Sequence, residues 1–116
     1  MTIREMYEAI DSDFDVVLGR LKKEAMISRL VKKYAEDKNV EMLCQSMENG
    51  NYEDAFTAAH TIKGLAMNLG FGPLSDSSSE MTERLRAGKY ENLEELLERV
   101  KTDHQNVIDQ IEKLED

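Results

Sequence analysis

The sequence predicts an all-α fold: an elongated antiparallel (up-and-down) four-helix bundle with additional short N-terminal helices. Only one Pro and six Gly occur among the 116 residues, which leaves long stretches without a helix breaker. Apolar residues recur at three- and four-residue spacing in every long segment. Short connections between such amphipathic segments favour antiparallel neighbours, and the length suits a single domain over residues 1–116.

The N-terminal half predicts short helical segments separated by polar breaks or bends, one of them at residues 37–39. Ser12 or Asp13 can serve as the N-cap of the second helix, and Gly50 ends the last segment of this half. The phase of the apolar stripe slips around residues 22–24, which indicates a bend or short turn there. The expected helices lie near residues 3–10, from Phe14 to Leu21, from Met26 or Ile27 to Tyr34, and from Val40 to Met47.

The C-terminal half predicts three longer helices. The first runs from about Asn51 to Leu69 and is closed by residues 70–73, and the second runs from Leu74 to Gly88. The last helix starts near Asn92, and its apolar positions have the alternating spacing of a bundle seam. We expect His104 to be a partly buried packing residue of this seam. The predicted seam consists of Leu93, Leu97, Val100, His104, Val107, Ile111 and Leu114.

Composition excludes several classes of protein. A net charge of −9 and a pI near 4.7 argue against nucleic-acid binding, which needs basic patches. The single Cys44 excludes an internal disulfide and a Cys-rich zinc site, and we expect it to be a small core residue. No apolar run approaches the roughly 18 residues of a membrane span, and no secretory signal is visible. We therefore expect a cytoplasmic protein that binds neither nucleic acid nor membrane.

The helix over residues 51–70 has an unusual outer face. On a helical wheel, His60, Gly64 and Met67 lie opposite the core direction, and Lys63 and Phe56 flank them. These five residues form one patch that faces largely outward. The core face of the same helix consists of Ala55, Ala59, Ile62, Ala66 and Leu69, whose small members allow close packing.

This patch suits phosphoryl transfer to a histidine. A neutral imidazole is a competent nitrogen nucleophile near pH 7, and Lys63, one turn from His60, can reach phosphoryl oxygens bound there. Gly64 costs its helix about 1 kcal/mol relative to Ala, which indicates that something approaches the backbone closely. Met67 and Phe56 either cover the edge of the core or contact a partner.

Residues 59–70, AHTIKGLAMNLG, resemble the phosphoacceptor motif of histidine-containing phosphotransfer (Hpt) domains, A-H-x-L/I-K-G-x-A-x-N-L-G. Residues 14–37 and 48–60 resemble the segments before it. The resemblance implies an elongated helical bundle that acts as a histidine phosphocarrier in a multistep two-component phosphorelay. His60 would accept a phosphoryl group from a receiver-domain aspartate and pass it to another receiver. Lys63 would stabilise the phosphoryl group, and Gly64 would give the receiver clearance.

The resemblance also implies partners. These are response-regulator receiver domains and a hybrid sensor histidine kinase. Mg²⁺ is expected on the receiver, and no cofactor is expected on this chain. We expect the chain to be a monomer. No ATP-binding region is visible, so the chain is expected to be a carrier and not a kinase. The sequence departs from the family at Met67, where a small residue is usual. It also has Thr82, with Glu80 and Glu83 nearby, where many members have an acidic residue.

Two other functions remain open at this stage. The chain could be a helical adaptor that docks on receiver domains or kinases without accepting phosphate, although an adaptor needs neither His60 nor Lys63. It could also be a structural protein that dimerises through its last helix. No metal-ligand spacing is visible. The basic residues Lys22, Lys23, Lys32 and Lys33 either steer an acidic partner or form a solvated face.

Overall fold

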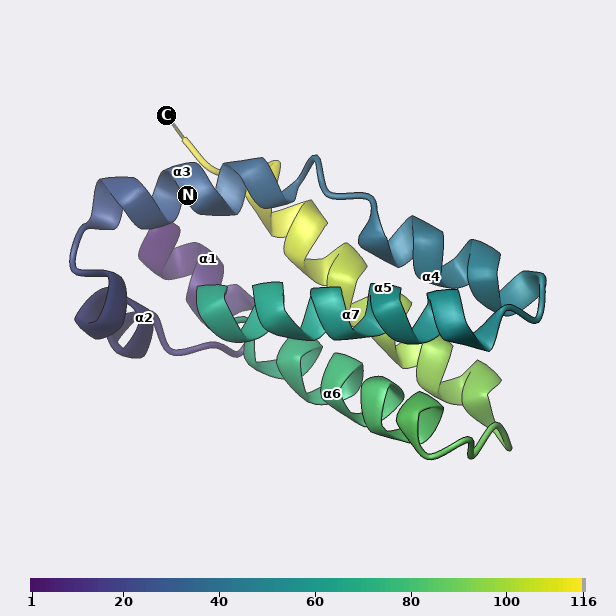
Figure 1. Ribbon diagram of the computed structural model, residues 1–116. Helices are drawn as coiled ribbons and strands as arrows, with labels where there is room; N and C mark the ends of the chain where they lie inside the picture. Colours follow the sequence, from purple (N-terminus) through teal and green to yellow (C-terminus); the bar gives the residue numbers. More distant parts are fainter. Residues whose placement is uncertain (116) are drawn as a thin grey trace.

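The computed structural model describes residues 1–115, which form seven helices and no strand. Together they make an elongated body of 40 × 24 × 19 Å (Figure 1). The predicted all-α class is therefore confirmed. The helices are α1 (Ile3–Ala9), α2 (Phe14–Leu21), α3 (Glu24–Tyr34), α4 (Asn39–Glu48), α5 (Tyr52–Leu69), α6 (Gly72–Arg86) and α7 (Leu93–Ile111).

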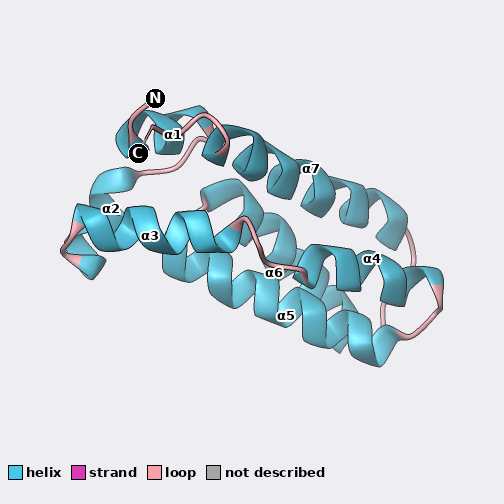
Figure 2. Cartoon of the chain, turned by 90° about the horizontal axis from the view of Figure 1, so that it is seen from above, coloured by secondary structure: helices cyan, strands magenta, loops and turns pink. Residues whose placement is uncertain are grey.

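The last four helices form the bundle core. Helix α5 packs between α4 and α6, and α7 closes the bundle by packing on α6 and α4. Short turns join α4 to α5 and α5 to α6, so successive helices run in opposite directions (Figures 1 and 2). The short N-terminal helices gather at one end, where α1 contacts α2 and α7, α2 contacts α3, and α3 contacts α5. This arrangement agrees with the predicted bundle and its N-terminal additions.

The seam of α7 differs from the prediction at its start and its end. Leu96 is buried, whereas Leu97 is half-buried at the edge of the core, so the prediction chose the less buried of two adjacent leucines. The steps from Leu93 to Leu96, Val100 and His104 are three, four and four residues, so the strict alternation of the seam does not extend back to the start of α7. Leu114, also predicted for the seam, lies beyond the end of α7 and is half-buried. Cys44 is half-buried against the core, and burial raises the pKa of its thiol.

Aromatic side chains connect the N-terminal helices to the bundle. The Tyr7 ring lies 5.2 Å from that of Phe14 and 5.8 Å from that of Phe71, between ring centroids. Tyr34 extends this row of rings. Its ring centroid lies 5.4 Å from that of Phe71 and 5.6 Å from that of the His104 imidazole. These contacts join α1, α2, α3, α7 and the α5–α6 turn in one buried cluster.

The turn after α5 allows the N-terminal helices to lie close to the end of α5. Gly70 ends the helix in the left-handed region, with φ of 72°, and the backbone N–H of Phe71 donates to the carbonyl of Ala66 at 2.9 Å. A methyl group on Gly70 would overlap Cγ2 of Val17 on α2. Glycine is therefore required here both by the backbone conformation and by the close contact with α2.

Side chains of α1 and α2 satisfy the last carbonyls of α5. The guanidinium of Arg20 donates to the carbonyl of Met67 at 2.9 Å and also to that of Asn68. The buried hydroxyl of Tyr7 donates to the carbonyl of Leu69 at 2.5 Å. Helix C-termini leave such carbonyls without partners, and a cation there is favourable for the helix dipole. The end of α5 is consequently held by two other helices.

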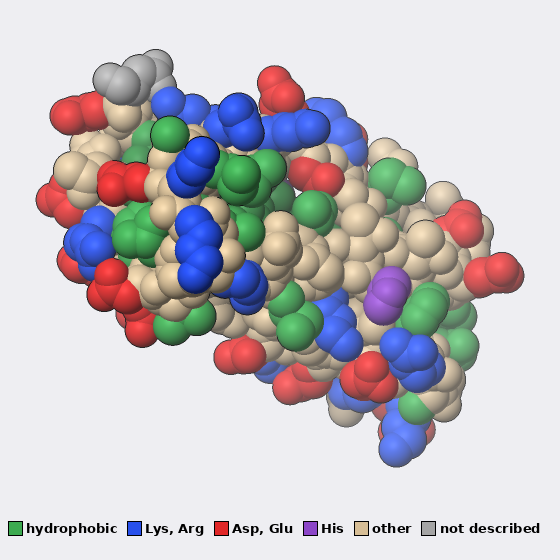
Figure 3. All heavy atoms as spheres, turned by 60° about the vertical axis from the view of Figure 1, so that its left-hand side comes forward, with side chains coloured by type: hydrophobic (Ala, Val, Ile, Leu, Met, Phe, Trp, Pro, Cys, Tyr) green, Lys and Arg blue, Asp and Glu red, His purple; other side chains and the backbone are tan. Residues whose placement is uncertain are grey.

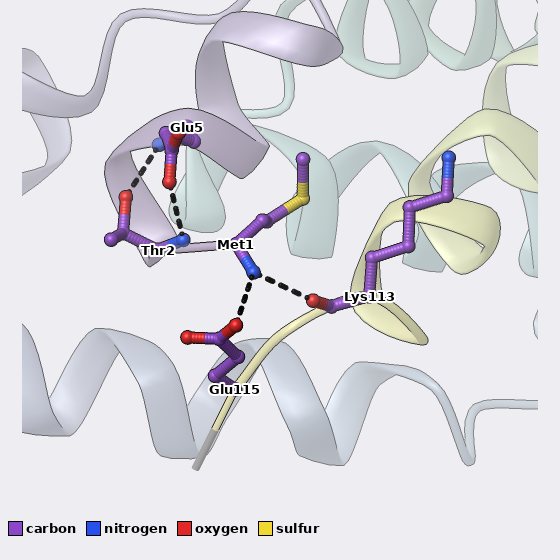
Figure 4. Close-up of polar contacts among 5 residues, drawn as sticks. All are labelled: Met1, Thr2, Glu5, Lys113 and Glu115. Atoms are coloured by element: carbon purple, nitrogen blue, oxygen red, sulfur yellow. Dashed lines mark hydrogen bonds and ion pairs between the residues drawn. The ribbon is translucent and has the colours of Figure 1, made fainter.

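The two ends of the described chain lie side by side (Figure 4). The amino group of Met1 donates to the carbonyl of Lys113 at 3.1 Å and lies 3.5 Å from the carboxylate of Glu115. Thr2 and Glu5 form a capping box that starts α1. These contacts attach α1 to the segment that follows α7.

We predict that Gly70→Ala lowers the free energy of unfolding by about 2–4 kcal/mol, because a left-handed alanine is strained and its methyl group displaces Val17. Gly50→Ala is the matched control: Gly50 has φ of 68°, but its added methyl group would meet no atom within 4 Å. The control should lose only about 1–2 kcal/mol. Urea denaturation measures both variants, and equal losses would contradict the role of the α2 contact.

We also predict that the free energy of unfolding decreases as the pH falls below about 6.5, in part because of His104. The Nδ1 atom of His104 is hydrogen bonded to the Tyr34 hydroxyl at 2.8 Å, and burial lowers the pKa of this imidazole, an effect that Asp37 partly opposes. As the pH falls, the imidazole of His104 therefore takes up a proton in the unfolded chain at a higher pH than in the folded protein. The contribution of neutral His104 is complete above the unfolded pKa and is lost as the pH falls through the folded pKa.

Denaturation of His104→Phe between pH 8 and pH 5 tests this origin. The variant should show a weaker dependence on pH than the wild type. His60→Gln, which removes the exposed histidine on α5, is measured beside it as the control for the loss of a histidine. A wild-type slope in His104→Phe would contradict the assignment.

Candidate functional site

His60 lies exposed in the middle of α5, although its neighbour Ala59 is fully buried. Its imidazole forms no hydrogen bond with any residue in the described part of the chain. Its one ring contact within residues 1–115 is with Phe56, one turn earlier, at 5.8 Å between centroids and 10° between planes. A space-filling view shows an exposed imidazole beside apolar and basic side chains (Figure 3). The side chain is thus accessible from solvent.

Lys63 lies one turn after His60 and is half-buried. Within residues 1–115 its ammonium group makes neither an ion pair nor a hydrogen bond. Glu80, Glu83 and Arg86 of the neighbouring helix α6 all form ion pairs, so the unpaired Lys63 is notable in a chain with net charge −9. The ammonium is available for an anion that binds at His60.

Gly64 completes the exposed face. A methyl group added to Gly64 would meet no atom within 4 Å, so internal packing does not explain this mid-helix glycine. Met67 continues the same face and is 51% exposed. The structure therefore brings together the residues that the sequence predicted, with His60, Gly64 and Met67 exposed and with Lys63 and Phe56 half-buried beside them.

Helix α6 supplies no hydrogen bond to the imidazole among the described residues. Thr82 is fully buried, and its hydroxyl donates to the carbonyl of Ser78 at 2.7 Å. Glu80 and Glu83 form ion pairs with arginines of α7 and α6, at 3.2 and 3.4 Å. All three candidates are consequently engaged with other partners.

One side chain beside the site was not predicted from the sequence. The guanidinium carbon of Arg86, in the last turn of α6, lies 5.1 Å from the centre of the Phe56 ring. Antiparallel helices bring together residues at equal distances from their connecting turn. Phe56 and Arg86 are each 15 positions from Phe71, so the predicted topology contained a signal for this pair.

A family model described as the Hpt domain matches residues 34–113. The chain belongs to the Hpt domain family. No curated protein and no solved structure is significantly similar to it. Hpt domains are phosphocarriers that interact with receiver domains in phosphorelays, and they are not kinases.

The Hpt match leaves out α1, α2 and nearly all of α3. Residues 20–38 hold seven of the 15 Lys and Arg but only three of the 24 Asp and Glu, which gives this segment a net charge of +4. Basic side chains lie on the surface at this end of the molecule, with acidic side chains beside them (Figure 3). On α2, Val16, Gly19 and Arg20 share one face, and Val16 is 62% exposed. Arg20 connects this face to the end of α5.

The described part of this Hpt protein contains no group of three or more His, Cys, Asp or Glu that could hold a metal ion. None of its helices combines the length and the apolar character needed to cross a membrane.

Proposed function

We propose that this Hpt protein carries phosphoryl groups between receiver domains, with His60 as the phosphoacceptor. One observation supports this most directly: an exposed imidazole lies one turn from the unpaired ammonium of Lys63 and beside the bare backbone of Gly64. A packing or surface role would not require these three features on one helical face.

In the proposed step, the lone pair of a neutral ring nitrogen of His60 attacks the phosphorus of a phosphoaspartate. A P–N bond forms, the P–O bond to the carboxyl group breaks, and the aspartate leaves as a carboxylate. The other ring nitrogen keeps its proton. The reverse step passes the phosphoryl group to another receiver. Lys63 stabilises the charge on the phosphoryl oxygens, and the remaining requirement is alignment of the reactants.

The proposed docking surface comprises Gly64, Met67 and Phe56 around His60. Gly64 gives the receiver clearance, and the apolar side chains exclude water around the reacting groups. Response-regulator receivers and a hybrid sensor histidine kinase are the proposed partners, and the basic segment 20–38 attracts their acidic surfaces. In this proposal Mg²⁺ is bound by the receiver, and the carrier needs no cofactor. The carrier itself is a cytoplasmic monomer.

We predict that incubation with a radiolabelled phospho-receiver labels wild-type protein and does not label His60→Gln. The label should be labile in acid and stable in base, as expected for a phosphoramidate. His104→Gln is the matched control, since it removes the other histidine, and it should be labelled normally. Equal labelling of His60→Gln and wild type would contradict the assignment. Receiver binding without any labelling of the wild type would indicate an adaptor.

We predict that Gly64→Leu blocks transfer from the receiver by steric exclusion and leaves the fold intact. Helicity and thermal stability should be unchanged or slightly higher, because Leu favours helix by up to about 1 kcal/mol relative to Gly and the added side chain meets no neighbour. Circular dichroism and the transfer assay measure the two effects.

Phosphoramidate, a small chemical phosphoryl donor, provides the control for Gly64→Leu. Because this donor needs no protein docking, it should phosphorylate the variant and the wild type at similar rates. Normal transfer from the receiver to Gly64→Leu would show that clearance at this position is not required.

A further inference from the structure

Three side chains from two helices form a column beside the acceptor. The guanidinium of Arg86 lies over the ring of Phe56, with its carbon 5.1 Å from the ring centre. The Phe56 ring is nearly parallel to the imidazole of His60, at 10° and with 5.8 Å between centroids. Arg86 belongs to the last turn of α6, whereas Phe56 and His60 belong to α5. The column therefore crosses the α5–α6 interface.

The column restrains an imidazole that has no hydrogen bond among residues 1–115. Because the side chain is exposed, the contact with Phe56 selects among the χ angles that the helix backbone allows. Phe56 is half-buried and is confined by the bundle on one side and by Arg86 on the ring face. Glu83 pairs with the same guanidinium at 3.4 Å and limits where it can move.

The plane of the imidazole determines how it can attack. The lone pair of a neutral ring nitrogen lies in the ring plane, so a donor must approach along that plane and in line with its leaving group. A ring held parallel to Phe56 presents its nitrogens to a narrow range of approach directions. A ring that rotates freely spends only part of its time in a productive orientation.

We propose that Arg86 is a positioning residue for phosphoryl transfer, acting through Phe56 to fix the plane of the His60 imidazole. This inference rests on the proposed function of His60. Arg86 itself is exposed, so its replacement removes no buried contact. A purely structural role therefore predicts little effect on the acceptor, whereas positioning predicts a change in the imidazole even when no partner is present.

Arg86→Gln is the main test, with Arg86→Lys as the conservative variant, because a lysine ammonium can also lie over an aromatic ring. Arg99→Gln is the matched control. It removes the same charge from another exposed arginine, which pairs with Glu80 at 3.2 Å. Phe56→Leu removes the aromatic face but keeps an apolar side chain. Thermal unfolding should be nearly the same for Arg86→Gln and Arg99→Gln.

The first measurement is NMR of the free protein. In Arg86→Gln and Phe56→Leu, the ring protons of His60 should lose part of the ring-current shift from Phe56, and side-chain relaxation should show a more mobile imidazole. Arg99→Gln should keep the wild-type signals, and Arg86→Lys should retain most of the shift. Unchanged His60 ring signals in Arg86→Gln would overturn the inference.

The second measurement is the kinetics of transfer from a phospho-receiver. For Arg86→Gln we expect kcat to fall by about threefold to tenfold with KM nearly unchanged, because orientation is lost and docking is kept. A rise in KM with unchanged kcat would make Arg86 a docking contact and would overturn its positioning role. Wild-type protein that takes no phosphate would overturn the proposed function itself, whatever the ring signals show. A labelled wild type with unaltered signals in Arg86→Gln would overturn only the role of Arg86.

Discussion

The carbonyl groups at the end of α5 impose the constraint on which the rest of the structure depends. A helix that stops leaves its last carbonyls without partners, and here they lie partly inside the protein, where an unmet polar group is unfavourable. Gly70 reverses the chain so that backbone N–H groups reach two of them, and Tyr7 and Arg20 supply the remaining donors. The positions of α1, α2 and α6 all follow from this solution.

The same constraint makes α5 a suitable support for a reactive side chain. Its inner face of Ala55, Ala59 and Ala66 is fully buried, so neighbouring helices pack closely and the backbone has little freedom. Functional groups on such an element keep their relative spacing without a dedicated network. The acceptor face therefore needs few residues, and His60 and Lys63 stay one turn apart because the helix fixes that distance.

The sequence was sufficient for features that depend on position along one helix, and it was less informative about pairs between helices. Periodicity placed His60, Gly64 and Met67 on the outside of α5 correctly, because burial follows the helical wheel. It chose Leu97 over the more buried Leu96, since two adjacent leucines fit the stripe and only the packing of α7 distinguishes them. The contacts of Arg20 and Arg86 depend on how helices are aligned in space, which the spacing within a single helix does not encode.

The boundary of the family match has a consequence for how this molecule folds. Tyr7 and Arg20, which hold the end of α5, lie before residue 34, where the Hpt match begins. The segment that the family model matches therefore depends on side chains from outside the match. Local opening of α1 and α2 would release the last carbonyls of α5 near Met67 and expose the amides of that turn to hydrogen exchange. The N-terminal helices thus act as a clamp on one end of the helix that bears His60.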